Sequence, residues 1–327
     1  MIRARTLLPV VALAAAFVPA APARTQEVHV PDFEVQVVVN LPATKNPMRT
    51  LRGRLVLLEF FGPWSDKCVE MVPHLNRLEQ ELGGQGLSVL AVAEGEKAAM
   101  EKFVTDNAVA YAVAGLDTLG YEALSNAVSV PGMPHAVLVA PDGTIAWKGH
   151  PGYLKAPAIK EHLGKVQSPP VRVPEPLASV KPMLDDGRWA EARTATQAAL
   201  AGLDKVSKAW AEGLVTWIET RRATWLSEAA AFETSGRFWD AWSMYADFAR
   251  RFAGMEGVDD ATAKATALRS NKDAAADLAA GDDVAKARDF LANNKKRQAE
   301  LILQRVLKTA KGTVHAERAK ELLDAAK

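Results

Sequence analysis

Apolar runs recur along the first half of the chain at the intervals expected of alternating strands and helices. Leu55–Phe61 and Leu87–Ala93 are almost wholly apolar, as expected for strands buried on both faces of a parallel sheet. Val35–Val39 indicates an earlier strand. Ala136–Ala140 is followed by the turn sequence Pro-Asp-Gly-Thr and by Ile145–Trp147, a pattern that predicts a hairpin. We therefore expect a sheet with both parallel and antiparallel pairs.

Helical periodicity fills the segments between these runs. Ser65 stands where a helix N-cap belongs, and apolar residues follow at helical spacing at Leu75, Leu78 and Leu82. Such a helix is long enough to cross between two parallel strands, which puts Ser65 and Cys68 at the turn where it begins. Further helices are expected at Glu96–Asn107, Leu119–Ala127 and Leu154–Leu163.

The second half of the chain has a different character. Residues 167–182 contain five prolines, a composition that predicts a semi-rigid linker rather than a helix or strand. Residues 183–327 are rich in alanine, charged residues and tryptophan and show no strand alternation, so we expect them to be all-helical.

Three short sequences in this second half have a common form. Asp186-Gly-Arg-Trp, Ser235-Gly-Arg-Phe and Asn293-Asn-Lys-Lys each place Gly or Asn where a left-handed residue would end one helix before another begins. They resemble the turn within a tetratricopeptide-type repeat, but their spacing departs from 34 residues. Irregular helix pairs or a helical bundle fit as well.

Tryptophan is frequent in the predicted helical region. Its spacing relative to neighbouring leucine and isoleucine favours packing in a helical core, although concave faces of helical arrays also bind peptides through aromatic residues. The residues concerned are Trp189, Trp210, Trp217, Trp225, Trp239 and Trp242.

Length and composition narrow the class of protein. A chain of 327 residues with 49% apolar residues is long enough for two domains. Lys and Arg number 40 against 39 Asp and Glu, a net charge of +1, whereas a nucleic-acid-binding protein would show a concentrated basic face. We expect no nucleic-acid partner.

The N-terminus has the pattern of a secretory signal peptide. Arg3 and Arg5 are followed by the apolar segment Leu7–Val18 and by Ala21-Pro-Ala, an Ala-x-Ala-type cleavage site. We expect a signal peptide at residues 1–23 and a periplasmic or secreted mature protein with no membrane span. An uncleaved N-terminal anchor is the alternative, although the apolar part is shorter than the about 20 residues of a membrane-spanning helix.

Cys68 is the only cysteine of the chain. No internal disulfide is therefore possible. An odd cysteine in an exported protein is either a reactive or intermolecular thiol or a small buried apolar residue.

Several motifs together resemble the thioredoxin superfamily, in particular its extracytoplasmic thiol–disulfide interchange and redoxin branch. The resemblance covers roughly residues 28–165. It is carried by Leu51-Arg-Gly-Arg-Leu-Val-Leu-Leu-Glu-Phe-Phe, by Trp64-Ser-Asp-Lys-Cys-Val-Glu-Met-Val-Pro, by Gly132-Met-Pro-His and by Pro141-Asp-Gly-Thr. It implies a thioredoxin-like α/β sandwich, a central mixed sheet flanked by helices, followed by the all-helical and repeat-like region. The expected domains are residues 24–166 and 183–327, joined by the linker 167–182.

The chain departs from the family pattern Trp-Cys-x-x-Cys at one position. Ser65 holds the place of the first cysteine and Cys68 that of the second. The first cysteine of this family attacks a disulfide as a thiolate, and the second resolves the mixed disulfide. A serine forms no disulfide, so dithiol exchange within this chain is excluded. We favour an N-capping role for the Ser65 hydroxyl, accepting from the amide of Cys68, over a catalytic serine.

Cys68 and Glu59 are the remaining candidates for chemistry. Cys68 is either an inert buried residue or a lone redox thiol, because Ser65-Asp-Lys-Cys68 also resembles the Ser/Thr-x-x-Cys pattern of the peroxiredoxins. Glu59 stands where the family keeps a buried acid beneath the active-site turn. If desolvated, it would have a raised pKa and could relay a proton to or from Cys68. A strand-end carboxylate that reaches water is the alternative.

Met133-Pro134 resembles the cis-proline loop that faces the active-site turn in this family. Together with Trp64 it is expected to hold proteins or extended peptides by β-addition. His135 follows directly and could approach Cys68, but we favour packing within the strand or exposure to solvent. A metal site with two ligands is improbable, and we expect neither metal nor cofactor. Two functions follow. One is a redox protein in which Cys68 works alone with an external thiol, as a thiol oxidoreductase or one-Cys peroxidase; the other is a non-catalytic protein-binding adaptor.

Overall fold

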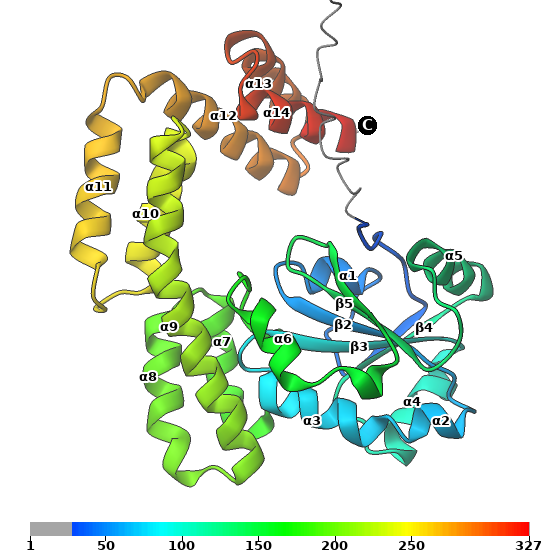
Figure 1. The fold of residues 1–327 in the computed structure, drawn as a ribbon. Helices are drawn as coiled ribbons and strands as arrows, with labels where there is room; N and C mark the ends of the chain where they lie inside the picture. Colours follow the sequence, from blue (N-terminus) through cyan, green and yellow to red (C-terminus); the bar gives the residue numbers. More distant parts are fainter. Residues whose placement is uncertain (1–27, 327) are drawn as a thin grey trace, which may run out of the picture.

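One mixed sheet organises the first part of the chain in the computed structural model, which describes residues 28–326. Its strand order is β1-β4-β3-β2-β5-β6 (Figure 1). The strands are β1 (Val37–Val39), β2 (Leu55–Phe60), β3 (Leu87–Glu94), β4 (Ala112–Leu116), β5 (His135–Val139) and β6 (Ile145–Gly149). Three neighbouring strands, β2, β3 and β4, run parallel, while β1, β5 and β6 pair antiparallel with their neighbours. The predicted mixed sheet is confirmed.

β4 was not predicted from the sequence. Ala112–Leu116 is a short run of mostly small apolar residues, and all five are buried between β3 and β1. A run this short gives no periodicity to distinguish a strand from a buried turn of helix. The adjacent expectations hold, since β5 and β6 form the predicted hairpin and β2 lies parallel to β3.

Helices cover both faces of the sheet. The face formed by Leu55 and Leu57 packs against α3, α4 and α6, and the face formed by Val56 and Leu58 packs against α1 and α5. The bounds are α1 (Pro47–Thr50), α2 (Asp66–Val69), α3 (Val72–Leu82), α4 (Lys97–Asp106), α5 (Thr118–Val128), the 3-10 turn η1 (Pro151–Tyr153) and α6 (Ala156–Leu163).

The single helix predicted after Ser65 is two helices. α2 ends at Val69 and α3 begins at Val72. Pro73 lies in the first turn of α3, where a missing N–H is tolerated; in a continuous helix it would leave the carbonyl of Val69 without its partner. Leu75, Leu78 and Leu82 are buried against the sheet as their spacing predicted.

The second part of the described chain is helical. Its helices are α7 (Lys181–Asp185), α8 (Trp189–Ala199), the 3-10 turn η3 (Leu200–Gly202), α9 (Lys205–Thr234), α10 (Phe238–Arg251), α11 (Val258–Ser270), α12 (Ala275–Ala292), α13 (Lys296–Thr309) and α14 (Val314–Ala325). No strand occurs between residues 183 and 326, so the all-helical prediction is confirmed.

The three turn sequences adopt one geometry. Gly187, Gly236 and Asn294 have φ values of 72°, 76° and 57°. In each case the next amide donates to a carbonyl five residues earlier, as in Arg188 to Met183 and Arg237 to Phe232. This is the hydrogen-bond pattern of a Schellman motif. The predicted left-handed helix ends are present, while the existence of a repeat stays a prediction.

The segment predicted as a linker contains a helical turn. Residues 175–180 form the 3-10 helix η2 (Glu175–Val180), and α7 begins directly after it. Leu177 and Val180 are buried in the apolar cluster that joins both parts of the chain. Residues 167–182 are therefore not a bare connection, because apolar side chains between the prolines anchor them.

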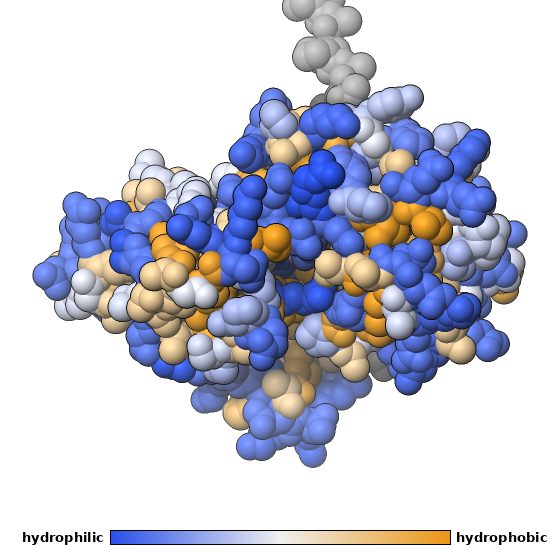
Figure 2. All heavy atoms as spheres, turned by 90° about the horizontal axis from the view of Figure 1, so that it is seen from below, coloured by the Kyte–Doolittle hydropathy of each residue, from blue (hydrophilic) through white to orange (hydrophobic). Residues whose placement is uncertain are grey.

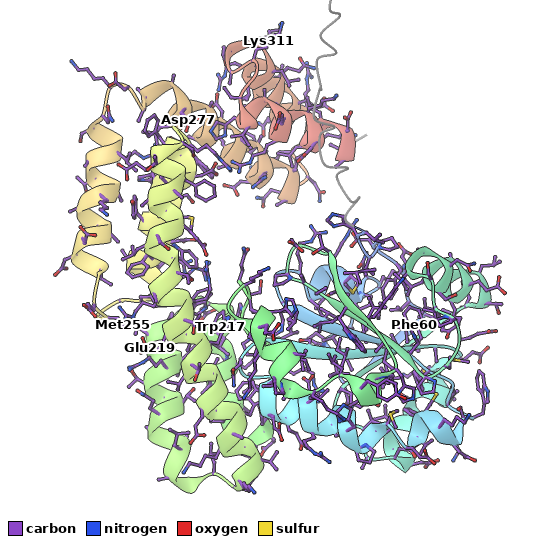
Figure 3. The ribbon with its side chains drawn as sticks, viewed as in Figure 1. Phe60, Trp217, Glu219, Met255, Asp277 and Lys311 are labelled. Carbon is purple, nitrogen blue, oxygen red and sulfur yellow. The ribbon has the colours of Figure 1, made fainter. Side chains whose placement is uncertain are left out.

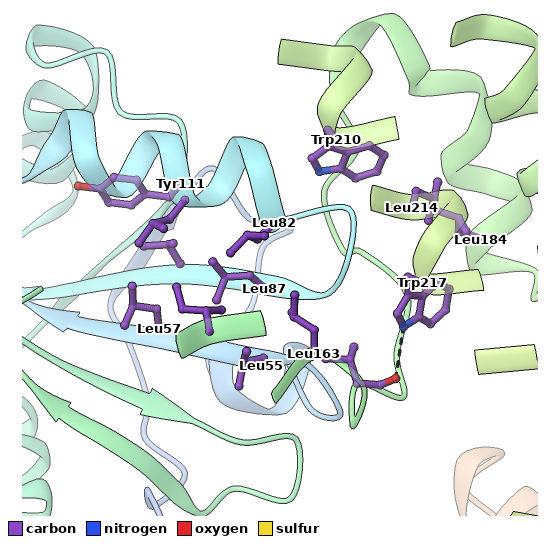
Figure 4. Close-up of a cluster of buried hydrophobic side chains, with 14 of the residues drawn as sticks. Leu55, Leu57, Leu82, Leu87, Tyr111, Leu163, Leu184, Trp210, Leu214 and Trp217 are labelled. Carbon is purple, nitrogen blue, oxygen red and sulfur yellow. Dashed lines mark hydrogen bonds between the residues drawn. The ribbon is translucent and has the colours of Figure 1, made fainter. Parts of the chain in front are cut away.

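The helical part packs directly on the α/β part. Trp210, Leu214 and Trp217 project from α9 toward α3 and α6, and the indole N–H of Trp217 donates to the carbonyl of Val166 at 3.3 Å (Figure 4). The labelled Trp217 lies between the two parts, well apart from Phe60 in the sheet (Figure 3). Of the six tryptophans, Trp189, Trp210, Trp217 and Trp225 are buried, in agreement with core packing.

Close approach of α9 to the end of α3 requires glycine. A Cβ on Gly84 would lie 2.0 Å from the carbonyl oxygen of Trp210 and 2.8 Å from the amide nitrogen of Leu214. Backbone atoms cannot move aside as the end of a side chain can, so even a methyl group would force the two helices apart.

We predict that Gly84→Ala lowers the free energy of unfolding by about 1–3 kcal/mol, because α9 must shift away from α3. Urea unfolding followed by circular dichroism measures this. Gly164→Ala is the control, since a Cβ there meets nothing within 4 Å. Equal unfolding midpoints for the two variants would contradict the tight contact.

Candidate functional site

The turn between β2 and α2 sets the positions of Ser65 and Cys68. The amide of Ser65 donates to the carbonyl of Gly62 at 3.0 Å, which closes the turn. The carbonyl of Ser65 then accepts from the amides of Cys68 and Val69 at 2.9 and 3.0 Å. Ser65 is thus the N-cap of α2, but its hydroxyl makes no capping hydrogen bond. The predicted bond from the Cys68 amide to that hydroxyl is wrong, because the backbone carbonyl takes this donor instead.

Cys68 faces the protein interior. Its side chain is 2% exposed and packs with Phe61 and Val72 in the apolar cluster beneath α3. The amide of Gly62 donates to its sulfur at 3.4 Å. Cys68 is a free thiol that the resting structure closes off from solvent.

Glu59 is buried on the same face of the sheet as Cys68. Alternation along β2 groups it with Leu57 and Phe61, which belong to the cluster that contains Cys68. Its side chain is 1% exposed, and Oε1 has no hydrogen-bond partner. Desolvation raises its pKa from 4.5 to about 8. The alternative of a carboxylate that reaches water is excluded.

Tyr111 lies near Glu59 and Cys68 and was not predicted as a site residue from the sequence. Burial, followed by the negative charges of Glu59 and Cys68, raises the pKa of its phenol. The three side chains therefore lie close enough to influence one another. Tyr111 directly precedes β4, and it was missed because that strand was not recognised.

The loop before β5 lies beside the turn. The Met133–Pro134 peptide bond is cis. His135 pairs with Phe60 across the β2–β5 ladder, so Met133 and Pro134 lie next to the chain where it leaves β2. Trp64 is 70% and Met133 41% exposed, while Pro134 is buried. Two large apolar side chains are thus exposed around the position of the family's active-site turn.

His135 does not face Cys68. Its partner Phe60 belongs to the apolar cluster on the opposite face of the sheet, so the possible approach of His135 to Cys68 does not occur. His135 is 9% exposed, in agreement with the favoured packing in the strand. Burial, followed by the charges of Lys148 and His150, lowers the pKa of His135, and its Nε2 lacks a partner. Within residues 28–326 no three His, Cys, Asp or Glu side chains are grouped to hold a metal ion.

This combination of sheet, flanking helices, helix start after β2 and cis-proline before β5 defines a thioredoxin-like fold. The family model of the AhpC/TSA family matches residues 27–148. This match supports placing the α/β part of the chain in the redoxin branch of the thioredoxin-like proteins.

Curated relatives are similar over the same part. The chain is 29% identical over 138 residues to the thiol-disulfide oxidoreductase ResA of Geobacillus thermodenitrificans, which covers 42% of this chain and 75% of that protein. It is 28% identical over 116 residues to ResA of Bacillus cereus strain ZK, covering 34% of this chain and 64% of that protein.

Two solved structures are similar over the same share of the chain. A thiol-disulfide isomerase from Corynebacterium glutamicum is 17% identical with a TM-score of 0.35, covering 42% of this chain and 96% of that chain. A thiol-disulfide oxidoreductase from Bacteroides fragilis is 18% identical with a TM-score of 0.33, covering 42% of this chain and 99% of that chain.

We predict that Glu59 makes stability fall as pH rises. Between its ordinary pKa of 4.5 and the folded value of about 8, unfolding releases the proton of Glu59. Relative to Glu59→Gln, the wild-type free energy of unfolding should fall by on the order of 1 kcal/mol per pH unit in this window. Urea unfolding at several pH values measures this difference.

Glu70→Gln is the matched control, because Glu70 is exposed one helical turn from the site. Its pH dependence should match that of the wild type. A Glu59→Gln curve parallel to the wild type would mean that Glu59 titrates normally in the folded protein.

Proposed function

We infer that this chain is an exported thioredoxin-like protein of the redoxin branch that holds an extended polypeptide and performs at most single-thiol redox chemistry. The observation that carries this inference is the arrangement of two side chains one helical turn apart. Ser65, at the start of α2, is partly exposed, whereas Cys68 is 2% exposed. The exposed position, from which a thiolate would attack, has no sulfur.

The missing sulfur limits the chemistry. In dithiol exchange the first thiolate forms a mixed disulfide with the substrate, and the second thiol displaces the reduced substrate. Here Cys68 alone could attack a partner disulfide, forming a mixed disulfide and releasing a partner thiolate. An external thiol must then attack that mixed disulfide. Before any of this, the turn between Gly62 and Cys68 has to open.

Glu59 is the group on this face that can exchange a proton with Cys68. Because its pKa is about 8, its carboxyl is mostly protonated at neutral pH. It would therefore act as a proton donor to a leaving sulfur at neutral pH, and as a base only above that range.

The polypeptide would bind at the Trp64 face, which we define as Trp64, Met133 and Pro134. Exposure of Trp64 and Met133 supports this choice, since large apolar side chains exposed together mark contact sites. The backbone of the Met133-Pro134 loop would pair with the bound chain.

Binding without chemistry is the second candidate function. The burial of Cys68 favours it, because a thiol that stays closed reacts with neither a disulfide nor a peroxide. In that case the Trp64 face and the helical part would together serve as an adaptor.

Export completes the proposal. The signal peptide expected at residues 1–23 lies outside the described residues. In the part of the chain that the structure describes, no helix combines the length and apolar character required to span a bilayer.

We predict that a bulky polyethylene-glycol maleimide labels Cys68 at least about a hundredfold more slowly in the native protein than in denaturant. A gel shift over time measures the rates, and Cys68→Ala is the blank. Equally fast labelling in both conditions would contradict a closed thiol and favour a reactive one.

We predict that wild-type protein does not reduce insulin with dithiothreitol as electron donor above the rate of dithiothreitol alone, whereas Ser65→Cys does. The substitution restores a thiol at the start of α2, with Cys68 as the resolving thiol. Turbidity measures insulin reduction. Ser65→Cys combined with Cys68→Ala is the control and should reduce insulin more slowly than Ser65→Cys, because dithiothreitol must then resolve the mixed disulfide. Wild-type activity, or an inactive Ser65→Cys protein, would refute the proposal that Ser65 stands in the place of the attacking cysteine.

A further inference from the structure

A cavity of about 220 Å³ lies where the α/β part meets the helical part. Residues from α3, from the segment that precedes β4, from the connection after residue 170 and from the start of α9 line it. They include Glu79, Ala110, Arg172, Val173, Val206 and Trp210. The face seen from below in Figure 2 is hollowed between these two parts. Pockets that hold drug-sized ligands measure about 300–1,000 Å³, so this cavity suits a smaller molecule.

Two opposite charges line the cavity without forming an ion pair. Arg172 donates a hydrogen bond to the carbonyl of Ala110, and Oε2 of Glu79 accepts from the amide of Val89 at 2.7 Å. Within residues 28–326 neither side chain forms a salt bridge, although the charges of Arg172 and Arg54 both act on Glu79. Burial raises the pKa of Glu79, and Arg172 opposes that shift.

Neighbouring groups do not complete this pair. Arg54 is buried nearby, but it donates to Ser88 and to the carbonyls of Gly83, Leu87 and Ser168. The start of α9 is capped by Asp204, which accepts from the amides of Val206 and Ser207. Gln80 and Ser207 also line the cavity, but Glu79 and Arg172 are its two charged residues.

Most of the remaining lining is apolar. Val173, Pro174, Val206 and Trp210 contribute to it. Val206 is 47% exposed at the mouth, whereas Trp210 is 5% exposed. An apolar group that entered the cavity would replace water along this wall.

We propose that the cavity binds a small zwitterion, a free α-amino acid with an apolar side chain. Its carboxylate would lie on the guanidinium of Arg172, its ammonium group on the carboxylate of Glu79, and its side chain against Trp210 and Val206. A carboxylate without an ammonium group would leave Glu79 unpaired, and an amine without a carboxylate would leave Arg172 unpaired. The proposal does not depend on Cys68 or on the Trp64 face.

Isothermal titration calorimetry of the full chain with L-phenylalanine tests the proposal. N-acetyl-L-phenylalanine, which lacks the ammonium group, and L-phenylalaninamide, which lacks the carboxylate, should each bind about tenfold more weakly or not at all. Absence of binding by L-phenylalanine, or equal binding by either derivative, would overturn the proposal.

Arg172→Gln and Glu79→Gln should each weaken binding of L-phenylalanine about tenfold. The amide oxygen of the Glu79→Gln variant can still accept from Val89. Arg77→Gln and Glu81→Gln are matched controls, because both residues are exposed on α3 and absent from the cavity lining. Their binding should equal that of the wild type.

Val206→Trp is an independent test that keeps the proposal falsifiable even when the two charge variants do not fold. Val206 is partly exposed at the mouth, so a larger side chain there should fill the cavity and leave the core intact. Circular dichroism and thermal unfolding should match the wild type while binding of L-phenylalanine is lost. Unchanged binding by a folded Val206→Trp protein would place the ligand elsewhere and overturn the proposal.

Discussion

The burial of β2 on both faces is the constraint on which the rest of the structure depends. β2 lies between β3 and β5, and all of Leu55–Phe60 is buried. Because the strand is enclosed, its carboxyl end must turn sharply at Gly62 into α2, which sets the positions of Ser65 and Cys68. The same enclosure desolvates Glu59 and gives it a pKa unlike that of a surface carboxyl. The geometry of the site is thus a consequence of how completely one strand is covered.

Sequence reasoning succeeded where a local pattern determines the structure. Hydrophobic periodicity predicted the buried strand β2 and the buried positions Leu75 and Leu78. Short-range sterics predicted the left-handed turns at Gly187 and Gly236. Sequence reasoning left the position of His135 open, because the face on which a side chain lies depends on strand register, and one residue of shift reverses it.

Other features depend on contacts that sequence does not encode locally. The amide of Cys68 donates to the carbonyl of Ser65 and not to its hydroxyl, because the path of the backbone through the turn brings the carbonyl within reach. The low exposure of Glu59 showed that it is a buried acid and not a carboxylate that reaches water. The low exposure of Cys68 likewise showed that its thiol is closed off from solvent. Tyr111 became visible as part of the site only when β4 was placed in the sheet. The cavity between the two parts could not be predicted, because its lining depends on how the two parts pack and no sequence motif indicates that.

Helix α9 has a mechanical consequence for the whole molecule. It is 30 residues long, so it extends about 45 Å, and it touches α3 near its beginning while α10 packs along it. The later helices α12 to α14 are connected to the α/β part through α9, through α10, which packs on it, and through α11, which packs on α10 (Figure 1). The contact with Gly84 lies at Trp210 and Leu214, about 30–36 Å from the end of α9, so a tilt of roughly 10° there would move that end by about 6 Å. The absence of a side chain at Gly84 therefore sets the orientation of α9 and, through it, the position of α12 to α14.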